Sequence, residues 1–252
     1  MPDDQFSDLL LAWFDRHGRH DLPWQFDRSP YRVWISEIML QQTQVVTAVK
    51  YFNRFIENFP DVTTLSKAKQ DYVLHHWTGL GYYARARNLH KTAKIIDEQY
   101  DGKLPLDLNS LINLPGIGRS TAGAILSLAC EQRHPILDGN VKRVLSRYHG
   151  VEGWPGKRDV EANLWSYAEL HTPAELISSY TQAIMDLGAT LCIRRKPDCQ
   201  HCPLNHDCVA FKTGREHELP ESKPKSNLPN RETIFSMIAN IVSRLGKLDF
   251  GL

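Results

Sequence analysis

Apolar residues recur along this chain at helical spacing, and proline and glycine fall between the periodic stretches. The stretch from Phe6 to Arg16 places four apolar residues on one face, namely Leu9, Leu10, Trp13 and Phe14. Ser29-Pro30 is typical of a helix start, so a helix is predicted from Tyr31 onward. Two later helices are predicted over 159–170 and 173–187. The pattern therefore predicts an all-α fold.

A glycine-containing turn lies near the middle of the chain, in Leu114-Pro115-Gly116-Ile117-Gly118-Arg119-Ser120-Thr121-Ala122. One helix is predicted to end over 108–113, and another is predicted over 122–129. Gly116 and Gly118 can both take a positive φ, which brings the backbone close to a partner. The first helix, the hairpin and the N-terminus of the second helix together form a binding site for a phosphate oxygen. An ordinary corner between two helices is the alternative.

Two carboxylates stand in contexts that suit acid–base chemistry. Glu37 lies in an apolar run and has no basic residue three or four positions away. Desolvation there raises a carboxyl pKa, as a general acid near neutral pH requires, whereas a solvated glutamate on a polar edge is the alternative. Asp138 stands where a later helix begins, so capping of that helix is the alternative role for Asp138 and for Asn140.

Two polar or aromatic clusters suit contact with nucleic acid bases. Gln41-Gln42-Thr43 follows the apolar run and offers side chains that can hydrogen-bond base edges. The segment 80–87 joins a glycine turn, Tyr82, Tyr83 and two arginines, a combination that suits stacking beside phosphates. Capping or surface roles for the first cluster, and a core position for the tyrosines, are the alternatives.

Charge is unevenly distributed in a chain whose formal net charge is only +1. Residues 82–147 hold ten Lys/Arg against six Asp/Glu, whereas 148–191 hold two against six. The excess positive charge thus surrounds the hairpin, where a phosphate backbone would lie. No apolar run reaches membrane-spanning length, and the acidic N-terminus lacks signal-peptide features, so a cytoplasmic protein is expected.

Four of the five cysteines lie close together, as Cys192, Cys199, Cys202 and Cys208. Structural disulfides are rare in cytosolic chains, so metal binding is the better interpretation. Zinc sites usually consist of two short Cys-x2–4-Cys pairs, and only one pair here is short. The spacing therefore favours a [4Fe–4S] cluster held by four thiolates, with zinc as the alternative.

The composition changes near the C-terminus. Residues 220–225 form a proline- and lysine-containing linker. Residues 231–242 are apolar and β-branched, like the first strand of a further domain, and the sequence stops at Leu252, too soon for that domain to be complete.

Glu37, the Leu-Pro-Gly-Ile-Gly hairpin, Asp138 and the four cysteines follow one another in the order typical of MutY-type adenine DNA glycosylases. The chain resembles this family of the helix-hairpin-helix Gly-Pro-Asp superfamily over about residues 1–225. Bifunctional glycosylase/lyases of the endonuclease III branch carry a nucleophilic lysine at the position of Ser120. Serine there, together with the motif around Glu37, favours the monofunctional adenine branch.

The resemblance implies a two-lobed, all-α helix-hairpin-helix glycosylase fold with a [4Fe–4S] loop. A six-helix barrel lobe is expected over 22–134, and a cluster-bearing lobe over 1–21 plus 135–225. Residues 226–252 would be a linker and the start of a largely missing, Nudix-like C-terminal domain. The implied partner is double-stranded DNA with adenine opposite 8-oxoguanine or guanine, bound by a monomer in the bacterial cytosol or nucleoid, without a membrane.

The resemblance also implies roles for individual residues. Glu37 would protonate adenine N7 after base flipping, and ionised Asp138 would stabilise the oxocarbenium ion. The expected DNA- and substrate-contacting residues are Trp24, Gln42, Thr43, Tyr82, Gly116, Gly118, Ser120, Asn140, Lys142 and Gln182. Among them, Trp24 and Gln182 would line the adenine pocket, Asn140 would orient Asp138, and Gln42 and Tyr82 would contact the opposite base. A monovalent cation at the hairpin is a further expected ligand. An endonuclease III-type glycosylase/lyase and a non-catalytic DNA-binding module on the same fold are the alternatives.

Overall fold

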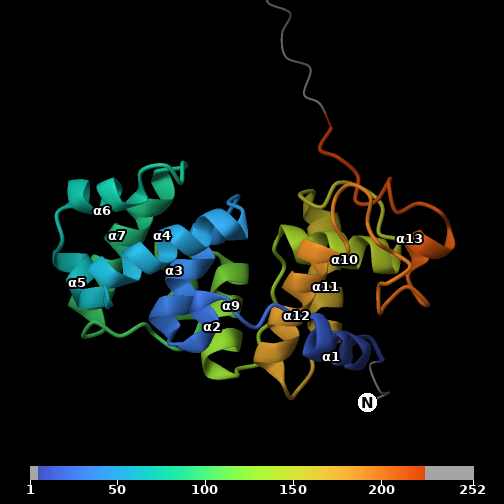
Figure 1. The fold of residues 1–252 in the computed structure, drawn as a ribbon, viewed down its shortest axis with the longest axis horizontal. Coiled ribbons are helices and arrows are strands. Elements are labelled where there is room, and N and C mark those ends of the chain that lie inside the picture. Colours follow the sequence, from blue (N-terminus) through green and yellow to red (C-terminus); the bar gives the residue numbers. More distant parts are fainter. Residues whose placement is uncertain (1–4, 225–252) are drawn as a thin grey trace, which may run out of the picture. The chain divides into compact units, whose positions relative to one another are not determined.

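The computed structural model describes residues 5–224, and every regular element in that range is an α-helix (Figure 1). The helices are α1 Gln5–His17, α2 Pro23–Phe26, α3 Pro30–Leu40, α4 Val45–Asn58, α5 Val62–Lys67, α6 Gln70–Trp77, α7 Ala84–Gln99, α8 Leu108–Ile112, α9 Arg119–Cys130, α10 Gly139–His149, α11 Arg158–His171, α12 Ile177–Thr190 and α13 Val209–Lys212. The predicted all-α class is confirmed. The strand expected over 231–242 lies outside the described residues.

Helix α3 is deeply packed, and its start follows the expected signal. Ser29 Oγ accepts a hydrogen bond from the backbone N–H of Arg32 (3.4 Å), and Pro30 occupies the first turn. Seven of its residues are buried, namely Tyr31, Val33, Trp34, Ile35, Ser36, Ile38 and Met39. A helix that is buried on most sides lies inside the packed core. Glu37 is therefore held in apolar surroundings by its own helix.

The helices pack against one another in an unbroken series of contacts (Figure 1). Helix α3 packs against α2, α4, α7 and α9, and α9 in turn packs against α12. Helix α12 contacts α1 and α10, and α10 contacts α11 and α13. All thirteen helices of the described part belong to one compact unit, Met1–Glu221. The predicted lobes over 22–134 and over 1–21 plus 135–225 stay a prediction.

The hairpin differs in detail from the sequence-based expectation. Helix α9 begins at Arg119, so Ser120 and Thr121 form its first turn instead of preceding it. Gly118 caps this helix with an ordinary extended backbone (φ −90°, ψ 172°). The left-handed conformation occurs at Gly116 alone of the two glycines, with φ +82°. Only one glycine of the hairpin is thus required for its backbone angle.

After α9 the chain turns back along that same helix. Glu131 ends α9 with φ +53°, and the next segment approaches so closely that a Cβ at Gly123 would lie 2.6 Å from the carbonyl oxygen of Pro135. The backbone N–H of Leu137 donates to Ser120 Oγ (3.0 Å). This return path places Asp138 beside the N-terminal turn of α9, next to the hairpin.

The helix predicted over 173–187 is observed as α12, Ile177–Thr190. It starts later because Leu176 has a left-handed backbone (φ +53°), which no helix interior accommodates. The first turn is anchored from outside by Glu131, whose carboxylate accepts from the N–H of Ser178 (3.1 Å). This contact is long-range and has no signal in the local sequence.

Candidate active site

Glu37 occupies the centre of α3 and is half-buried among apolar neighbours. Burial, and after it the negative charge of Asp138, together raise the pKa of its carboxyl from 4.5 to about 8. A carboxyl with that pKa keeps its proton at neutral pH and can donate it. The solvated-glutamate alternative is therefore not what the structure describes.

Asp138 is the N-cap of α10. One carboxylate oxygen accepts from the backbone N–H of Val141 (2.8 Å), so the capping alternative is correct for Asp138 and not for Asn140. Burial raises the pKa of Asp138, whereas backbone N–H groups and the cations of Arg143 and Lys142 oppose that shift by stabilising the charged form.

Asp138, at the start of α10, acts electrostatically on Glu37 in α3. The charge of Asp138 is a cause of the raised pKa of Glu37, so an ionised Asp138 favours the protonated form of Glu37. Helix α10 directs its N-terminal N–H groups at Asp138, which favours negative charge there. One protonated and one ionised carboxyl is the arrangement that glycoside cleavage uses.

Asn140 and Lys142 lie on the first turn of α10, beside Asp138. Asn140 Oδ1 accepts from a terminal nitrogen of Arg143 (2.8 Å). Asn140 also packs against α12, because a Cβ at Gly188 would lie 2.6 Å from the Cβ of Asn140. Lys142 Nζ forms an ion pair with Glu161 of α11 (2.6 Å). The predicted contacts of both residues with DNA stay predictions.

The hairpin itself leaves space on one side. A Cβ placed at Gly118 or Gly139 would meet no atom within 4 Å, whereas one at Gly116 would lie 3.0 Å from Asn88 Cβ. Gly118 therefore faces open space at the N-terminus of α9, where free N–H groups favour an anion. Arg119 beside it stacks on the ring of Trp165 (3.9 Å to the centroid).

The residues predicted to contact the opposite base lie in two separate segments. Gln42 follows α3, is exposed and has φ +56°. Tyr82 precedes α7, is 63% exposed and has φ +48°. Thr43 Oγ1 lies 3.3 Å from both terminal nitrogens of Arg85. With Tyr82 at that exposure and Tyr83 at 39%, the core alternative for the tyrosines is wrong.

The two residues predicted to line an adenine pocket are both buried. Trp24 in α2 is 5% exposed, and its ring packs edge-on against Phe52. Gln182 in α12 is 4% exposed and donates through Nε2 to Asp186 (2.9 Å). That bond orients the amide and leaves its carbonyl oxygen for another partner. Their role in base recognition stays a prediction.

The four cysteine side chains near the C-terminus of the described chain line one small apolar cavity, and all are free thiols. The buried guanidinium of Arg147, from α10, lies against them and donates to Cys192 Sγ (3.3 Å). Burial, and then the other thiols, raise the pKa of Cys199 to about 11, and burial raises that of Cys202 to about 12. The sequence-based grouping of these residues thus corresponds to a spatial group.

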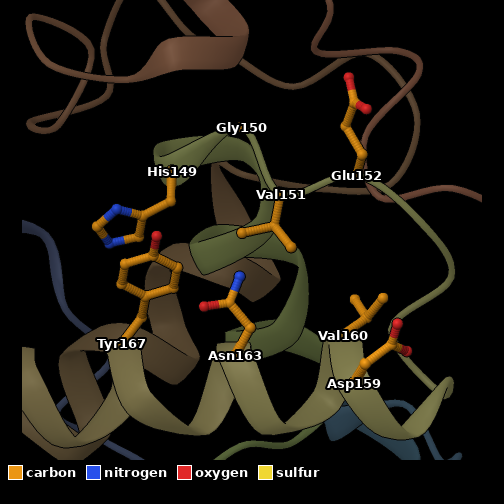
Figure 2. Close-up of a pocket in the computed structure, with 8 residues that line it drawn as sticks. All are labelled: His149, Gly150, Val151, Glu152, Asp159, Val160, Asn163 and Tyr167. Carbon is orange, nitrogen blue, oxygen red and sulfur yellow. The ribbon is translucent and has the colours of Figure 1, made fainter.

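A surface pocket of about 380 Å³ lies between the end of α10 and α11, away from these residues (Figure 2). It is lined by His149, Gly150, Val151, Glu152, Asp159, Val160, Asn163 and Tyr167. Figure 2 shows the rings of His149 and Tyr167 side by side, and they stack at a centroid distance of 3.6 Å. None of the predicted catalytic residues lines this pocket, so it is not the candidate site.

Comparison with known proteins connects this geometry to a family. The family model described as HhH-GPD superfamily base excision DNA repair protein matches residues 35–169, which include Glu37, the hairpin and Asp138. The adenine DNA glycosylase of Buchnera aphidicola subsp. Schizaphis graminum is 48% identical over 233 residues, covering 92% of this chain and 67% of that protein. The chain belongs to the adenine DNA glycosylase family of the HhH-GPD superfamily.

Other members and structures extend this assignment. The human adenine DNA glycosylase is 38% identical over 236 residues, covering 90% of this chain and 43% of that protein. A solved thermostable thymine-DNA glycosylase superposes with a TM-score of 0.74 at 26% identity, covering 82% of this chain and 95% of that chain. A non-covalent endonuclease III–DNA complex, at 23% identity and a TM-score of 0.68, shares the fold. The predicted family, fold and enzyme class are confirmed at this level.

Three contributors to the site in this adenine DNA glycosylase family member were missed by the sequence analysis. Gly123 allows the return segment to approach α9, Glu161 pairs with Lys142, and Arg85 connects the segments that bear Gln42 and Tyr82. Each acts through a partner distant in the sequence, and only the arginine lay in a motif already singled out.

Among the described residues, no helix is long and apolar enough to cross a membrane.

Proposed function

We propose that this chain is a monofunctional DNA glycosylase that removes adenine paired with 8-oxoguanine or guanine. The observation that carries the proposal is the carboxyl pair beside the hairpin, in which burial and then the charge of Asp138 raise the pKa of Glu37. Adenine is a poor leaving group as an anion, so protonation of N7 by Glu37 lowers the barrier to cleavage of the C1′–N9 bond. The positive charge that develops on the sugar is stabilised by ionised Asp138.

DNA binding is assigned to the hairpin and the surfaces beside it. Open space at Gly118 and the N-terminus of α9 suit a backbone phosphate, and a base must leave the stack to reach Glu37. Two relatives with solved structures are endonuclease III–DNA complexes, which supports the fold as a DNA-binding scaffold. A monomer in the bacterial cytosol, and a monovalent cation at the hairpin, are part of the same proposal.

The endonuclease III-type lyase is the second candidate, and the position of Ser120 argues against it. Its hydroxyl accepts from Leu137 N–H, so this position supports the backbone before Asp138 and supplies no amine. The amine of Lys142, on α10, is held by Glu161. A Schiff base with C1′ would need a free amine, so hydrolysis is the favoured reaction.

We further propose that the four cysteines hold a [4Fe–4S] cluster. Four free thiols lining one cavity fit this group in number and in softness. The cluster would supply positive charge that stabilises the thiolates and fixes the segment; glycosidic hydrolysis has no redox step.

The proposed function is tested with duplexes that carry adenine opposite 8-oxoguanine, guanine or thymine, with and without later alkali. We expect strand breaks only after alkali, on the first two duplexes. Asp138→Asn is the control, because asparagine still caps α10 but removes the charge; we expect the single-turnover rate to fall by roughly 10²-fold or more. Breaks without alkali, or an Asp138→Asn variant with near-normal rates, would contradict the assignment.

A further inference from the structure

The side chain of Arg85 lies between the two segments that carry Gln42 and Tyr82. Its Nη1 atom is within hydrogen-bond distance of the carbonyl oxygens of Ile38 (3.0 Å), Met39 (2.9 Å) and Gln41 (2.5 Å). These oxygens belong to the C-terminal end of α3, where the helix has no partners of its own for them. Nη1 of the guanidinium thus caps the C-terminal end of α3, the helix that carries Glu37.

The other terminal nitrogen of Arg85 reaches the second segment. Nη2 donates to the carbonyl oxygens of Leu80 and Gly81, each at 3.2 Å, directly before Tyr82. The guanidinium also lies 5.6 Å from the ring centroid of Tyr82. Because guanidinium is planar and rigid, these contacts fix the separation of the two segments more tightly than a flexible ammonium would.

Each segment leads into an exposed residue with an unfavourable backbone. Gln42 and Tyr82 have φ of +56° and +48°, although neither is glycine. Such conformations are unfavourable and persist only where surrounding contacts determine them. Arg85 binds the carbonyl oxygen of the residue directly before each of them, Gln41 and Gly81.

Helix α7 connects this arrangement to the hairpin. Arg85 and Asn88 line a cavity of about 110 Å³ together with Gly116, and Thr92 Oγ1 donates to the carbonyl oxygen of Pro115 (2.8 Å). Positions 85, 88 and 92 share one face of the helix. Gln42 and Tyr82 are therefore held at a fixed position relative to the hairpin, and the hairpin is the part that we assign to binding of the DNA backbone.

We propose that Arg85 is a positioning residue that holds Gln42 and Tyr82 as one reading unit for the base opposite the excised adenine. Arg85 acts through these two residues and does not itself contact the base. The inference rests on the proposed function for its substrate, while the clamp itself rests on the contacts above. Discrimination between 8-oxoguanine and guanine depends on both side chains being held at once, because specificity is a difference between two binding energies.

The clamp is tested first without activity, by backbone hydrogen exchange in Arg85→Lys. Lysine keeps the charge but cannot span both segments. We expect amides in 38–43 and in 80–83 to exchange faster together, by roughly tenfold. The matched control is Arg87→Lys, an exposed arginine on the same helix, which should change neither segment. Unchanged exchange, or a change in one segment only, would overturn the clamp.

The reading role is tested by affinity for duplexes with 8-oxoguanine or guanine opposite adenine, measured in the Asp138→Asn background so that cleavage does not interfere. The quantity measured is the affinity for the 8-oxoguanine duplex divided by that for the guanine duplex. We expect Arg85→Lys to reduce this ratio by roughly tenfold. In a protein that already carries Gln42→Ala and Tyr82→Ala, Arg85→Lys should reduce it no further. A ratio unchanged by Arg85→Lys, or fully additive effects, would overturn the inference. Failure of the proposed function is seen separately, as absence of adenine release by the parent protein.

A second variant guards against loss of folding in Arg85→Lys. Thr43→Val removes only the hydroxyl that lies 3.3 Å from both terminal nitrogens of Arg85. We expect faster exchange in 80–83, because Thr43 contacts Arg85, which in turn binds the carbonyl oxygens of Leu80 and Gly81. No change there would count against the clamp.

Discussion

Glu37 and Asp138 carry the same functional group in different surroundings, and the proposed function gives them different protonation states. Glu37 lies mid-helix, where no free N–H group is available to stabilise a charge. Asp138 lies at a helix N-terminus and accepts from Val141 N–H, with two basic residues close behind it on α10. The surroundings of the two residues thus support the proposed roles of Glu37 as proton donor and Asp138 as charge stabiliser.

The raised pKa of Glu37 predicts a pH dependence for the reaction. As the pH rises through about 8, Glu37 loses the proton that it must donate, so the single-turnover rate should fall above that value. Glu37→Gln should remove most of the activity at every pH. A wild-type rate that stays constant up to pH 10 would show that Glu37 is not the acid.

The same pKa gives a stability test. An unfolded chain ionises Glu37 above its ordinary pKa of 4.5, but the folded chain does so only near 8. Wild-type protein should therefore lose stability relative to Glu37→Gln between these pH values, by roughly 1.4 kcal/mol per pH unit at most. Denaturant unfolding of both proteins across this range measures the difference.

At the scale of elements, the site depends on how the segment after α9 returns along that helix. The segment approaches at Gly123 and is held at Ser120, which leaves Asp138 beside the hairpin. Helix α3 packs on the same helix α9, so both carboxyl groups are positioned by one element. Displacement of the segment between α9 and Asp138 would change the separation of the two carboxyl groups without a substitution at either residue.

Gly123→Ala tests this arrangement. Its Cβ would lie 2.6 Å from the Pro135 carbonyl oxygen, which forces the backbone to shift, so we expect a loss of about 1–3 kcal/mol in unfolding free energy and a lower rate. Gly118→Ala is the matched control for stability, because its Cβ would meet no atom within 4 Å. Equal stability of both variants in thermal unfolding would show that the close approach is not important.

At the scale of the whole described molecule, α10 joins the carboxylate to the cysteine group. The helix begins after Asp138, and its residues Arg143 and Arg147 hold the segment that contains Cys192. Arg143 donates to the carbonyl oxygen of Cys192 (2.6 Å), and Arg147 to that of Ile193 (2.8 Å). The cysteine segment is thus part of the scaffold on which Asp138 is placed.

Cluster content and its effect on stability follow from the proposed cofactor. We expect about four iron and four sulfide per chain, with brown absorbance in protein purified under native conditions. Cys202→Ser should lose iron and unfold at a lower temperature, whereas Cys130→Ser, at the free cysteine outside the group, should retain both properties. Stoichiometric zinc in the native protein would contradict the proposal.

The sequence by itself determined those features that depend on local order and residue type. Helical spacing predicted the all-α class, Ser29-Pro30 predicted the start of α3, and Pro115-Gly116 predicted the hairpin. Glu37, Asp138 and the four cysteines were identified because unusual residues stand in recognisable surroundings. Helix starts were less accurate at α9 and α12, where backbone angles at Gly118 and Leu176 decide the boundary.

Only the tertiary structure decided which of these features act together. The influence of Asp138 on Glu37 requires two residues about a hundred positions apart to meet through α9, and no local pattern encodes that distance. The clamp at Arg85 is equally non-local, because one guanidinium satisfies carbonyl oxygens from two separate segments. Sequence specifies the groups and the local backbone, whereas packing between distant segments sets their separation, and the chemistry depends on that separation.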